Sequence, residues 1–192
     1  ASLKHPTKVQ QLTIPAILAG RDLLALAQTG SGKTLAFGLP LLQQILLQQQ
    51  TQLQGTKSVQ PPNALALVLV PTRELALQVT EALQAVASQL SASLIIQLLC
   101  GGVALEDQLA ELAAKPQVLV ATPGRLLDLC KQAHVSLDSI KHLVLDEADR
   151  LLEMGFWPDV QKLMAFMPKL KQTSLFSATL PEALDTLAGK LL

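Results

Sequence analysis

The chain has 192 residues, enough for one domain of ordinary size with a substantial core. Hydrophobic residues make up 49% of the chain and charged residues 16%, which excludes an intrinsically disordered protein. The formal net charge is zero, which argues against holding nucleic acid by bulk positive charge but leaves contacts from a few arginines and backbone amides open.

The cysteine and hydropathy patterns indicate the compartment. Cys100 and Cys130 lack the CxxC or Cys/His spacing of a redox or zinc site, so we expect buried structural thiols in a reducing environment. No stretch is apolar enough for a membrane span, and no signal peptide opens the chain. We therefore expect a soluble, cytoplasmic protein that does not contact membranes.

The first part of the chain predicts a helix, a strand and a second helix. A short helical pattern follows Pro6, with Thr7 as its N-cap. The apolar run 23–27 predicts a buried strand, and a glycine-rich turn leads from it into an amphipathic helix over 33–48. The glutamine-rich segment 48–62 predicts a solvated surface excursion, to which we assign no chemistry.

Beyond this segment, apolar runs alternate with helical patterns. The predicted strands cover 64–70, 94–100, 117–121, 142–146 and 173–176, and the predicted helices cover 73–90, 105–114, 125–131, 150–154, 159–167 and 181–192. Such alternation specifies an α/β fold of three layers, with a mostly parallel sheet and helices on both faces. Ligands of such sheets bind outside the carboxyl ends of the strands, so we expect the polar strand-end motifs to gather there.

The first strand-end motif is the stretch 27–34, which we call the phosphate loop. It matches the pattern G-x-x-x-x-G-K-[ST] except that Ala27 replaces the first glycine. Gly30 and Gly32 allow the positive φ of a turn that directs backbone N–H groups at phosphate oxygens. Lys33 is placed to reach the β- and γ-phosphates, and the Thr34 hydroxyl is placed to bind Mg²⁺.

The second motif is the acidic turn, residues 146–149, which directly ends an apolar run. A carboxylate of Asp146 beside a phosphate loop can hold Mg²⁺, and Glu147 is placed to orient or deprotonate an attacking water. Taken alone, the same four residues could simply cap a helix. Their pairing with a phosphate loop favours the metal and hydrolysis interpretation.

Other strand ends carry weaker signals. Arg73 and Arg125 could be ordinary surface arginines, or they could line a track of phosphate contacts together with Thr72, Thr122 and the backbone near Gly102. Short hydroxyl side chains at 177 and 179 could hydrogen-bond the acidic turn or form a helix N-cap before residue 181. From the residues alone, Gln10 reads as a solvated helix residue.

In this order, from Pro6 to Thr179, the motifs resemble those of the DEAD-box RNA helicases, and specifically the first of their two RecA-like domains. The stretch 149–156 resembles bacterial members. The resemblance covers nearly the whole chain and implies that residues 1–192 form a single ATP-binding domain. It implies a P-loop enzyme that uses ATP and Mg²⁺ and that couples ATP binding and hydrolysis to RNA binding and local duplex unwinding.

The resemblance also implies a role for each motif. Segment 6–10 is similar to the Q motif of the family, in which Gln10 would read the adenine edge. Lys33, Asp146 and Glu147 would be catalytic, and Thr34 and Asp146 would hold the metal. The other implied nucleotide contacts are Pro6, Thr7, Thr29, Gly30, Ser31 and Gly32. The implied contacts to the RNA backbone are Pro71, Thr72, Arg73, Gly102, Thr122, Pro123, Gly124 and Arg125. The residues implied to couple ATP state to strand separation are Asp149, Ser177, Ala178 and Thr179.

Nothing in the chain resembles the second RecA-like domain, which by the resemblance would supply arginine fingers. We therefore expect the domain alone to be a monomer that binds nucleotide with Mg²⁺, binds RNA weakly and with little sequence preference, and hydrolyses ATP slowly. Two alternatives stay open: a P-loop ATPase that acts on DNA, and a non-catalytic, nucleotide-gated RNA clamp or scaffold.

Overall fold

The structure is a computed structural model that describes all residues except 1–4, 55–63, 91–93 and 170. The strands are β1 Leu23–Leu26, β2 Ala66–Leu69, β3 Ile96–Leu99, β4 Val118–Ala121, β5 His142–Leu145 and β6 Gln172–Ser177. The helices are α1 Lys8–Leu18, α2 Lys33–Gln54, α3 Arg73–Ala87, α4 Leu105–Leu112, α5 Pro123–Lys131, α6 Ala148–Glu153, α7 Trp157–Met164 and α8 Glu182–Leu191.

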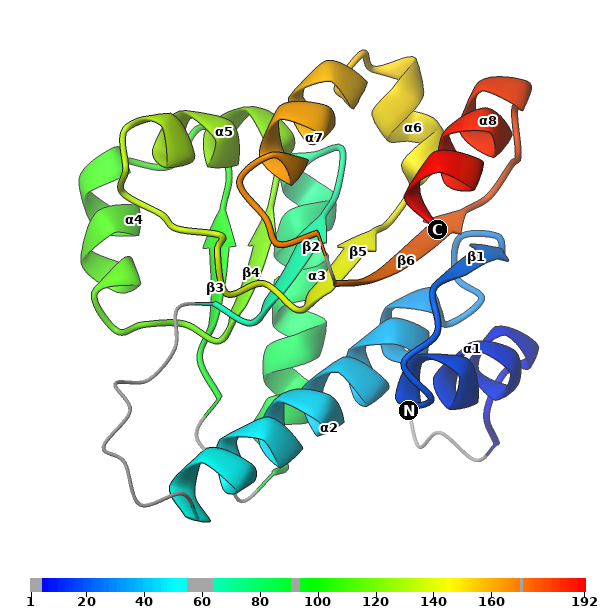
Figure 1. The fold of residues 1–192 in the computed structure, drawn as a ribbon, viewed down its shortest axis with the longest axis horizontal. Helices are drawn as coiled ribbons and strands as arrows, with labels where there is room; N and C mark the ends of the chain where they lie inside the picture. Colours follow the sequence, from blue (N-terminus) through cyan, green and yellow to red (C-terminus); the bar gives the residue numbers. More distant parts are fainter. Residues whose placement is uncertain (1–4, 55–63, 91–93, 170) are drawn as a thin grey trace.

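The six strands form one sheet in the order β1-β6-β5-β2-β4-β3, and every neighbouring pair is parallel. Helices α1, α2 and α3 cover one face of the sheet, and α4 to α8 cover the other (Figure 1). This arrangement confirms the expected three-layer α/β fold. The sheet is entirely parallel because each connection carries a helix that crosses back over the sheet.

Two apolar cores lie on the two faces of the sheet, because successive side chains of a strand point in opposite directions. In β2, Val68 packs with the helices α1 to α3, whereas Leu67 and Leu69 pack with the helices of the other face. Cys100 and Cys130 are buried as expected, and burial raises the pKa of the Cys130 thiol to about 11. Such a thiol is protonated at neutral pH and unreactive.

Most helix boundaries differ from the expected ones by one to three residues, and α2 differs by more. Two of these differences have a clear local cause. Helix α2 continues to Gln54, so the first part of the glutamine-rich excursion 48–62 is helical, and its remainder lies outside the described residues. Glutamine is a good helix former, which explains the extension. Helix α5 begins at Pro123 rather than Arg125, because proline is favourable in the first turn of a helix.

The carboxyl ends of the central strands are held in register by backbone hydrogen bonds. Asp146 N–H donates to the Leu69 carbonyl, Val70 N–H donates to the Ala121 carbonyl, and Thr122 N–H donates to the Leu99 carbonyl, each at 3.0 Å. This row brings the ends of β5, β2, β4 and β3 to one edge of the sheet. The polar motifs that follow these strands therefore share one side of the molecule.

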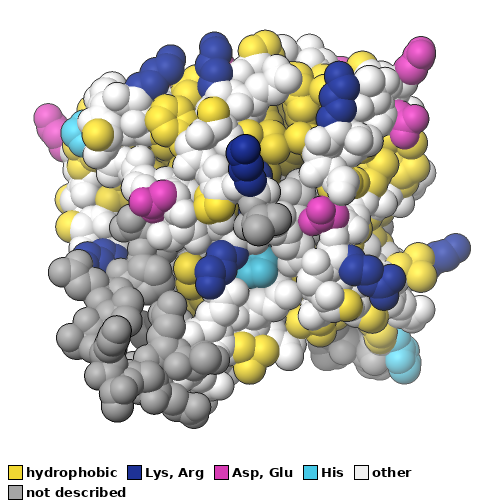
Figure 2. Space-filling view, in the orientation of Figure 1, with side chains coloured by type: hydrophobic (Ala, Val, Ile, Leu, Met, Phe, Trp, Pro, Cys, Tyr) yellow, Lys and Arg dark blue, Asp and Glu magenta, His cyan; other side chains and the backbone are white. Residues whose placement is uncertain are grey.

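The surface contains no large region of one charge on the face in view. Figure 2 shows lysine, arginine and acidic side chains scattered among apolar and polar ones. The most exposed large apolar side chains are Leu12 of α1, 67% exposed, and Leu26 of β1, 54% exposed. Both line a cleft of about 640 Å³ between α1 and β1. Within the described ranges, no helix is both long and apolar enough to cross a bilayer.

Candidate active site

The phosphate loop adopts a tight turn that ends in the first turn of α2. Gly30 has φ of 81° and Gly32 has φ of 92°, values that favour glycine. The backbone N–H and the hydroxyl of Ser31 both donate to the Gln28 carbonyl, at 3.2 and 2.6 Å. Helix α2 begins at Lys33 and has no acidic residue in its first turn, so its N-terminus offers partial positive charge.

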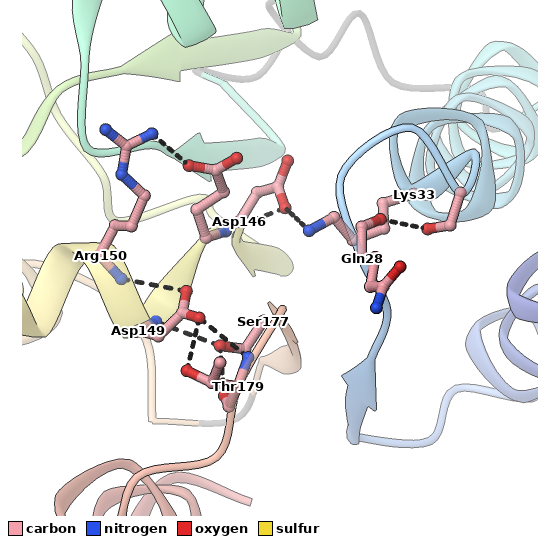
Figure 3. Close-up of polar contacts among 9 residues, drawn as sticks. Gln28, Lys33, Asp146, Asp149, Arg150, Ser177 and Thr179 are labelled. Carbon is pink, nitrogen blue, oxygen red and sulfur yellow. Dashed lines mark hydrogen bonds and ion pairs between the residues drawn. The ribbon is translucent and has the colours of Figure 1, made fainter.

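The structure brings the phosphate loop and the acidic turn together. Lys33 Nζ lies 4.0 Å from Asp146 Oδ1. The strands that precede these residues, β1 and β5, are not neighbours, because β6 lies between them in the sheet. Figure 3 shows the two side chains pointing toward each other. Both are buried, with 6% and 5% of their surface exposed, and Lys33 Nζ has no hydrogen-bond partner among the residues that the structure describes. A buried ammonium without an acceptor is costly unless an anion completes its coordination.

Burial raises the pKa of Asp146 to about 6, against the opposing effects of the Lys33 charge and of the hydrogen bond from Glu147 N–H. The carboxyl therefore reaches its protonation midpoint at about pH 6, well above the range of an ordinary aspartate and about one unit below neutral pH. A bound cation would favour the ionised form because it replaces the lost hydration. This behaviour suits a group that binds and releases a metal.

The raised pKa of Asp146 predicts that stability depends on pH. Between pH 3.8, its ordinary pKa, and about 6, the folded protein binds more protons at this group than the unfolded chain does. The contribution of Asp146 to the free energy of unfolding should therefore fall as pH rises through this window, by on the order of 2–3 kcal/mol. Asp146→Asn should remove this component of the slope when urea unfolding is measured across the window. An unchanged slope would contradict the raised pKa.

Glu147 lies at a strained backbone position. Its φ of 51° and ψ of 50° are left-handed, an uncommon conformation for a residue with a side chain. The carboxylates of Asp146 and Glu147 are both buried at this turn. Glu147 Oε2 accepts a hydrogen bond from Arg150 Nη1 at 3.0 Å, and this contact fixes the orientation of the carboxylate.

Asp149 connects the acidic turn to the end of β6. Its Oδ2 accepts hydrogen bonds from the Thr179 hydroxyl and N–H, at 2.8 and 2.9 Å, and its own N–H donates to Ser177 Oγ at 3.2 Å (Figure 3). Burial opposes ionisation of Asp149, but the hydrogen bonds of Thr179, Ser177 and the Arg150 N–H together outweigh it and lower its pKa. The hydroxyls thus contact the acidic turn, and the alternative of a side-chain N-cap for α8 is wrong. Ala178 is exposed beside them.

Gln10 connects α1 to the phosphate loop. Its Oε1 accepts from Thr7 N–H at 3.0 Å, and its Nε2 donates to the Gly32 carbonyl at 3.1 Å. Thr7 and Gln10 form a capping box at the start of α1. Gln10 is only 6% exposed, so the interpretation as a solvated helix residue is wrong. Pro6 is exposed and precedes the cap.

Gly32→Ala should disrupt this connection. An added Cβ would lie 2.6 Å from Gln10 Nε2 and 3.2 Å from Thr7 Oγ1, at a φ that already strains any other residue. We expect a loss of about 1–2 kcal/mol in the free energy of unfolding and at least a tenfold loss of ADP affinity, because the loop can no longer hold its turn. Calorimetry measures both quantities. Gly189→Ala, which meets nothing within 4 Å in α8, is the control.

The residues assigned to RNA by resemblance lie along the ends of β2, β3 and β4. Thr72 caps α3 by accepting from Leu75 N–H at 3.3 Å, and Thr122 is at the N-cap position of α5 without a side-chain bond. Arg73 Nη1 donates to the Gly102 carbonyl at 3.1 Å, and Arg125 Nη2 donates to a neighbouring carbonyl at 3.3 Å. Pro71 and Pro123 are buried, and Gly124 is half-buried. Each arginine therefore holds a loop carbonyl with one N–H group, which leaves its other N–H donors for a ligand.

Sequence reasoning missed two residues at this edge. Arg150 orients Glu147, and the buried Gln108 of α4 contacts the backbone that follows β3. No short motif marks either of them. The three-residue spacing of Glu147 and Arg150, which places them on one helix turn, could have indicated the role of Arg150. No local pattern indicates the role of Gln108.

The donor set fits a nucleotide with Mg²⁺. A buried lysine that lacks a hydrogen-bond acceptor in the described part of the chain and a helix N-terminus both suit phosphate groups. The half-buried Thr34 hydroxyl and the Asp146 carboxylate suit Mg²⁺, which usually takes one or two protein ligands and keeps several waters. Thr29 is exposed at the outer side of the loop. The individual roles of these residues stay predictions.

Comparison with curated proteins gives relatives over nearly the whole chain. The chain is 45% identical to the ATP-dependent rRNA helicase rrp-3 of Neurospora crassa over 96% of its length and 33% of that protein. It is 47% identical to the ATP-dependent RNA helicase DbpA of Escherichia coli, over 96% of the chain and 38% of that protein. The chain thus spans about a third of the length of the curated relatives it matches.

Comparison with solved structures agrees with this result. The fold matches a hypothetical ATP-dependent RNA helicase from Sulfolobus tokodaii with a TM-score of 0.85 and 32% identity, over 100% of this chain and 51% of that one. It matches a DEAD box protein from Methanococcus jannaschii with a TM-score of 0.83 and 35% identity, over 97% and 47%. The DEAD/DEAH box helicase family model matches residues 7–187. The chain therefore belongs to the DEAD/DEAH box helicase family.

Proposed function

We propose that this chain is the ATP-binding domain of an ATP-dependent RNA helicase. Its supporting observation is the buried Lys33 ammonium at the N-terminus of a helix that follows a glycine-rich turn. This ammonium forms an ion pair with Asp146 at 4.0 Å and has no hydrogen-bond partner among the described residues. In this proposal Lys33 contacts the β- and γ-phosphates, and Gln10, next to the phosphate loop, contacts the adenine. Thr34 and Asp146 hold Mg²⁺, which neutralises phosphate charge when bound.

Hydrolysis in this proposal depends on Glu147. Its carboxylate, oriented by Arg150 and by a left-handed backbone, accepts a proton from the attacking water. In the same proposal, Asp149 couples the acidic turn to Ser177 and Thr179 through its hydrogen bonds. The segment that contains these two residues leads into α8. Strand separation would require this segment to report nucleotide state to a second RecA-like domain.

RNA binding is assigned to the edge formed by the ends of β2, β3 and β4. The formal net charge of zero favours backbone contacts from arginines and N–H groups over attraction by bulk charge. Such contacts discriminate little between sequences and sense RNA through its shape and 2′-hydroxyls. Because net charge is zero, we expect RNA affinity to depend on few phosphates and to change modestly with salt.

The test is ATP hydrolysis by the full-length protein with single-stranded RNA or with DNA of the same sequence. Stimulation by RNA alone supports the proposal. Stimulation by DNA alone favours an ATPase that acts on DNA, and nucleotide-dependent RNA binding without hydrolysis favours a clamp. The domain by itself should bind ADP with Mg²⁺ but turn over slowly, because arginine fingers in trans accelerate comparable reactions by about 10³–10⁵.

A further inference from the structure

The loop between β3 and α4, residues 100–103, is held by three side chains. We call it the glycine loop. Arg73 Nη1 donates to the Gly102 carbonyl at 3.1 Å, and Arg125 Nη2 donates to the Val103 carbonyl at 3.3 Å. Gln108 Nε2 donates to the Cys100 carbonyl at 2.9 Å and to the Val103 carbonyl at 3.3 Å. These donors therefore engage the carbonyls of Cys100, Gly102 and Val103.

Gln108 differs from the two arginines because it is only 2% exposed. Both hydrogens of its amide point to loop carbonyls, so the side chain has no donor left for any other partner. Its own backbone carbonyl accepts from Gln97 Nε2 at 2.8 Å, and Gln97 is 3% exposed in β3. A buried pair of glutamines thus fixes the start of α4 against the strand that precedes the loop.

The glycine loop lies at the surface, and its N–H groups have no acceptor within the fold that the structure describes. Gly101 and Gly102 are exposed, and Gly102 has φ of 78°. Within the described part of the chain, no group accepts a hydrogen bond from the N–H of Gly101, Gly102 or Val103. Successive N–H groups on a turn with a left-handed residue form a concave donor set that suits an anionic oxygen.

We propose that Gln108 is a positioning residue for RNA binding: from inside the fold it holds the glycine loop in the conformation that presents these N–H groups to a backbone phosphate. The inference rests on the proposed function, because it assumes that RNA binds at this edge. By this inference, part of the RNA affinity depends on a buried side chain that RNA does not contact. The arginines hold the same loop from its exposed side.

The chain offers a matched control for a purely structural role. Gln117 is also a buried glutamine, 8% exposed, whose amide makes two backbone hydrogen bonds: its Oε1 accepts from Ile95 N–H at 2.8 Å, and its Nε2 donates to the Lys115 carbonyl at 2.9 Å. It lies beside the same two strands, β3 and β4, at their opposite ends. Loss of its amide should cost comparable stability without affecting the glycine loop.

The experiment compares the wild-type chain with Gln108→Met and Gln117→Met. Melting temperature, ADP affinity and affinity for a labelled single-stranded oligouridylate are measured for each. We expect both variants to melt earlier, both to bind ADP as the wild type does, and only Gln108→Met to lose RNA affinity, by about tenfold. Equal RNA affinity in the two folded variants, whether reduced or unchanged, would overturn the inference.

Amide chemical shifts provide a readout that stability alone does not move. Oligouridylate should shift the Gly101 and Gly102 signals of the wild type and of Gln117→Met, and should shift them much less in Gln108→Met. If Gln108→Met does not fold, Gln97→Met removes the anchor of Gln108 and should reduce RNA affinity in the same direction, and unchanged affinity would then overturn the inference. A wild-type chain that binds ADP but no RNA would instead contradict the proposed function itself.

Discussion

Glu147→Gln is expected to lower RNA-stimulated ATP hydrolysis by the full-length protein about 10³-fold, because general-base catalysis contributes roughly 10²–10⁴ to such reactions. Glutamine keeps the size of the side chain and can still accept a hydrogen bond from Arg150, which now lies 3.0 Å from Glu147 Oε2. It cannot accept the proton of the attacking water. Nucleotide and RNA affinity should therefore stay close to those of the wild type while turnover is lost.

The control for this prediction is Glu153→Gln, an exposed acid at the end of the same helix, α6. It changes the net charge by the same amount and should leave hydrolysis within a factor of about two. Steady-state phosphate release and equilibrium binding of labelled ATP separate the catalytic step from binding. If Glu147→Gln retained wild-type turnover, Glu147 would not be the base, and a non-catalytic clamp would become the better interpretation of the domain.

Lys33→Met should lower the affinity for ADP with Mg²⁺ at least about 100-fold, because it removes a charge-assisted contact to phosphate in a buried site. Lys33 is 6% exposed and its ammonium donates no hydrogen bond to any described residue, so its N–H groups are available to a nucleotide. Methionine preserves the length and the apolar stem of the side chain. The effect should therefore come from the lost charge rather than from a cavity.

The same substitution has a second consequence in the nucleotide-free protein. The Lys33 charge lowers the pKa of Asp146 against the effect of burial, so its loss should raise that pKa above about 6 and weaken Mg²⁺ binding near neutral pH. Lys131→Met, at the exposed end of α5, is the matched control and should leave both quantities unchanged. Calorimetric titration measures the affinity. Wild-type ADP binding by Lys33→Met would contradict the assigned phosphate site.

The local sequence pattern was sufficient to predict the strands and helices and their order along the chain. The apolar run 142–146 predicted β5, the turn signals at Gly30 and Gly32 predicted the phosphate loop, and alternating strands and helices predicted the three-layer fold. These features are local in sequence, because hydrophobic periodicity and glycine conformational freedom act within a few residues. The rule for parallel sheets also predicted that strand-end motifs would share one edge.

The tertiary structure alone decided which side chains meet at that edge. The approach of Lys33 to Asp146 across β6 depends on strand order, the left-handed turn at Glu147 depends on packing on both sides of it, and the contacts of Gln108 depend on how α4 lies against β3. None of these is encoded in a short window, because partners far apart in sequence are selected by the packing of the whole domain. The sequence therefore determined the chemical groups and their edge of the sheet, and the fold determined their distances, their protonation and their hydrogen bonds.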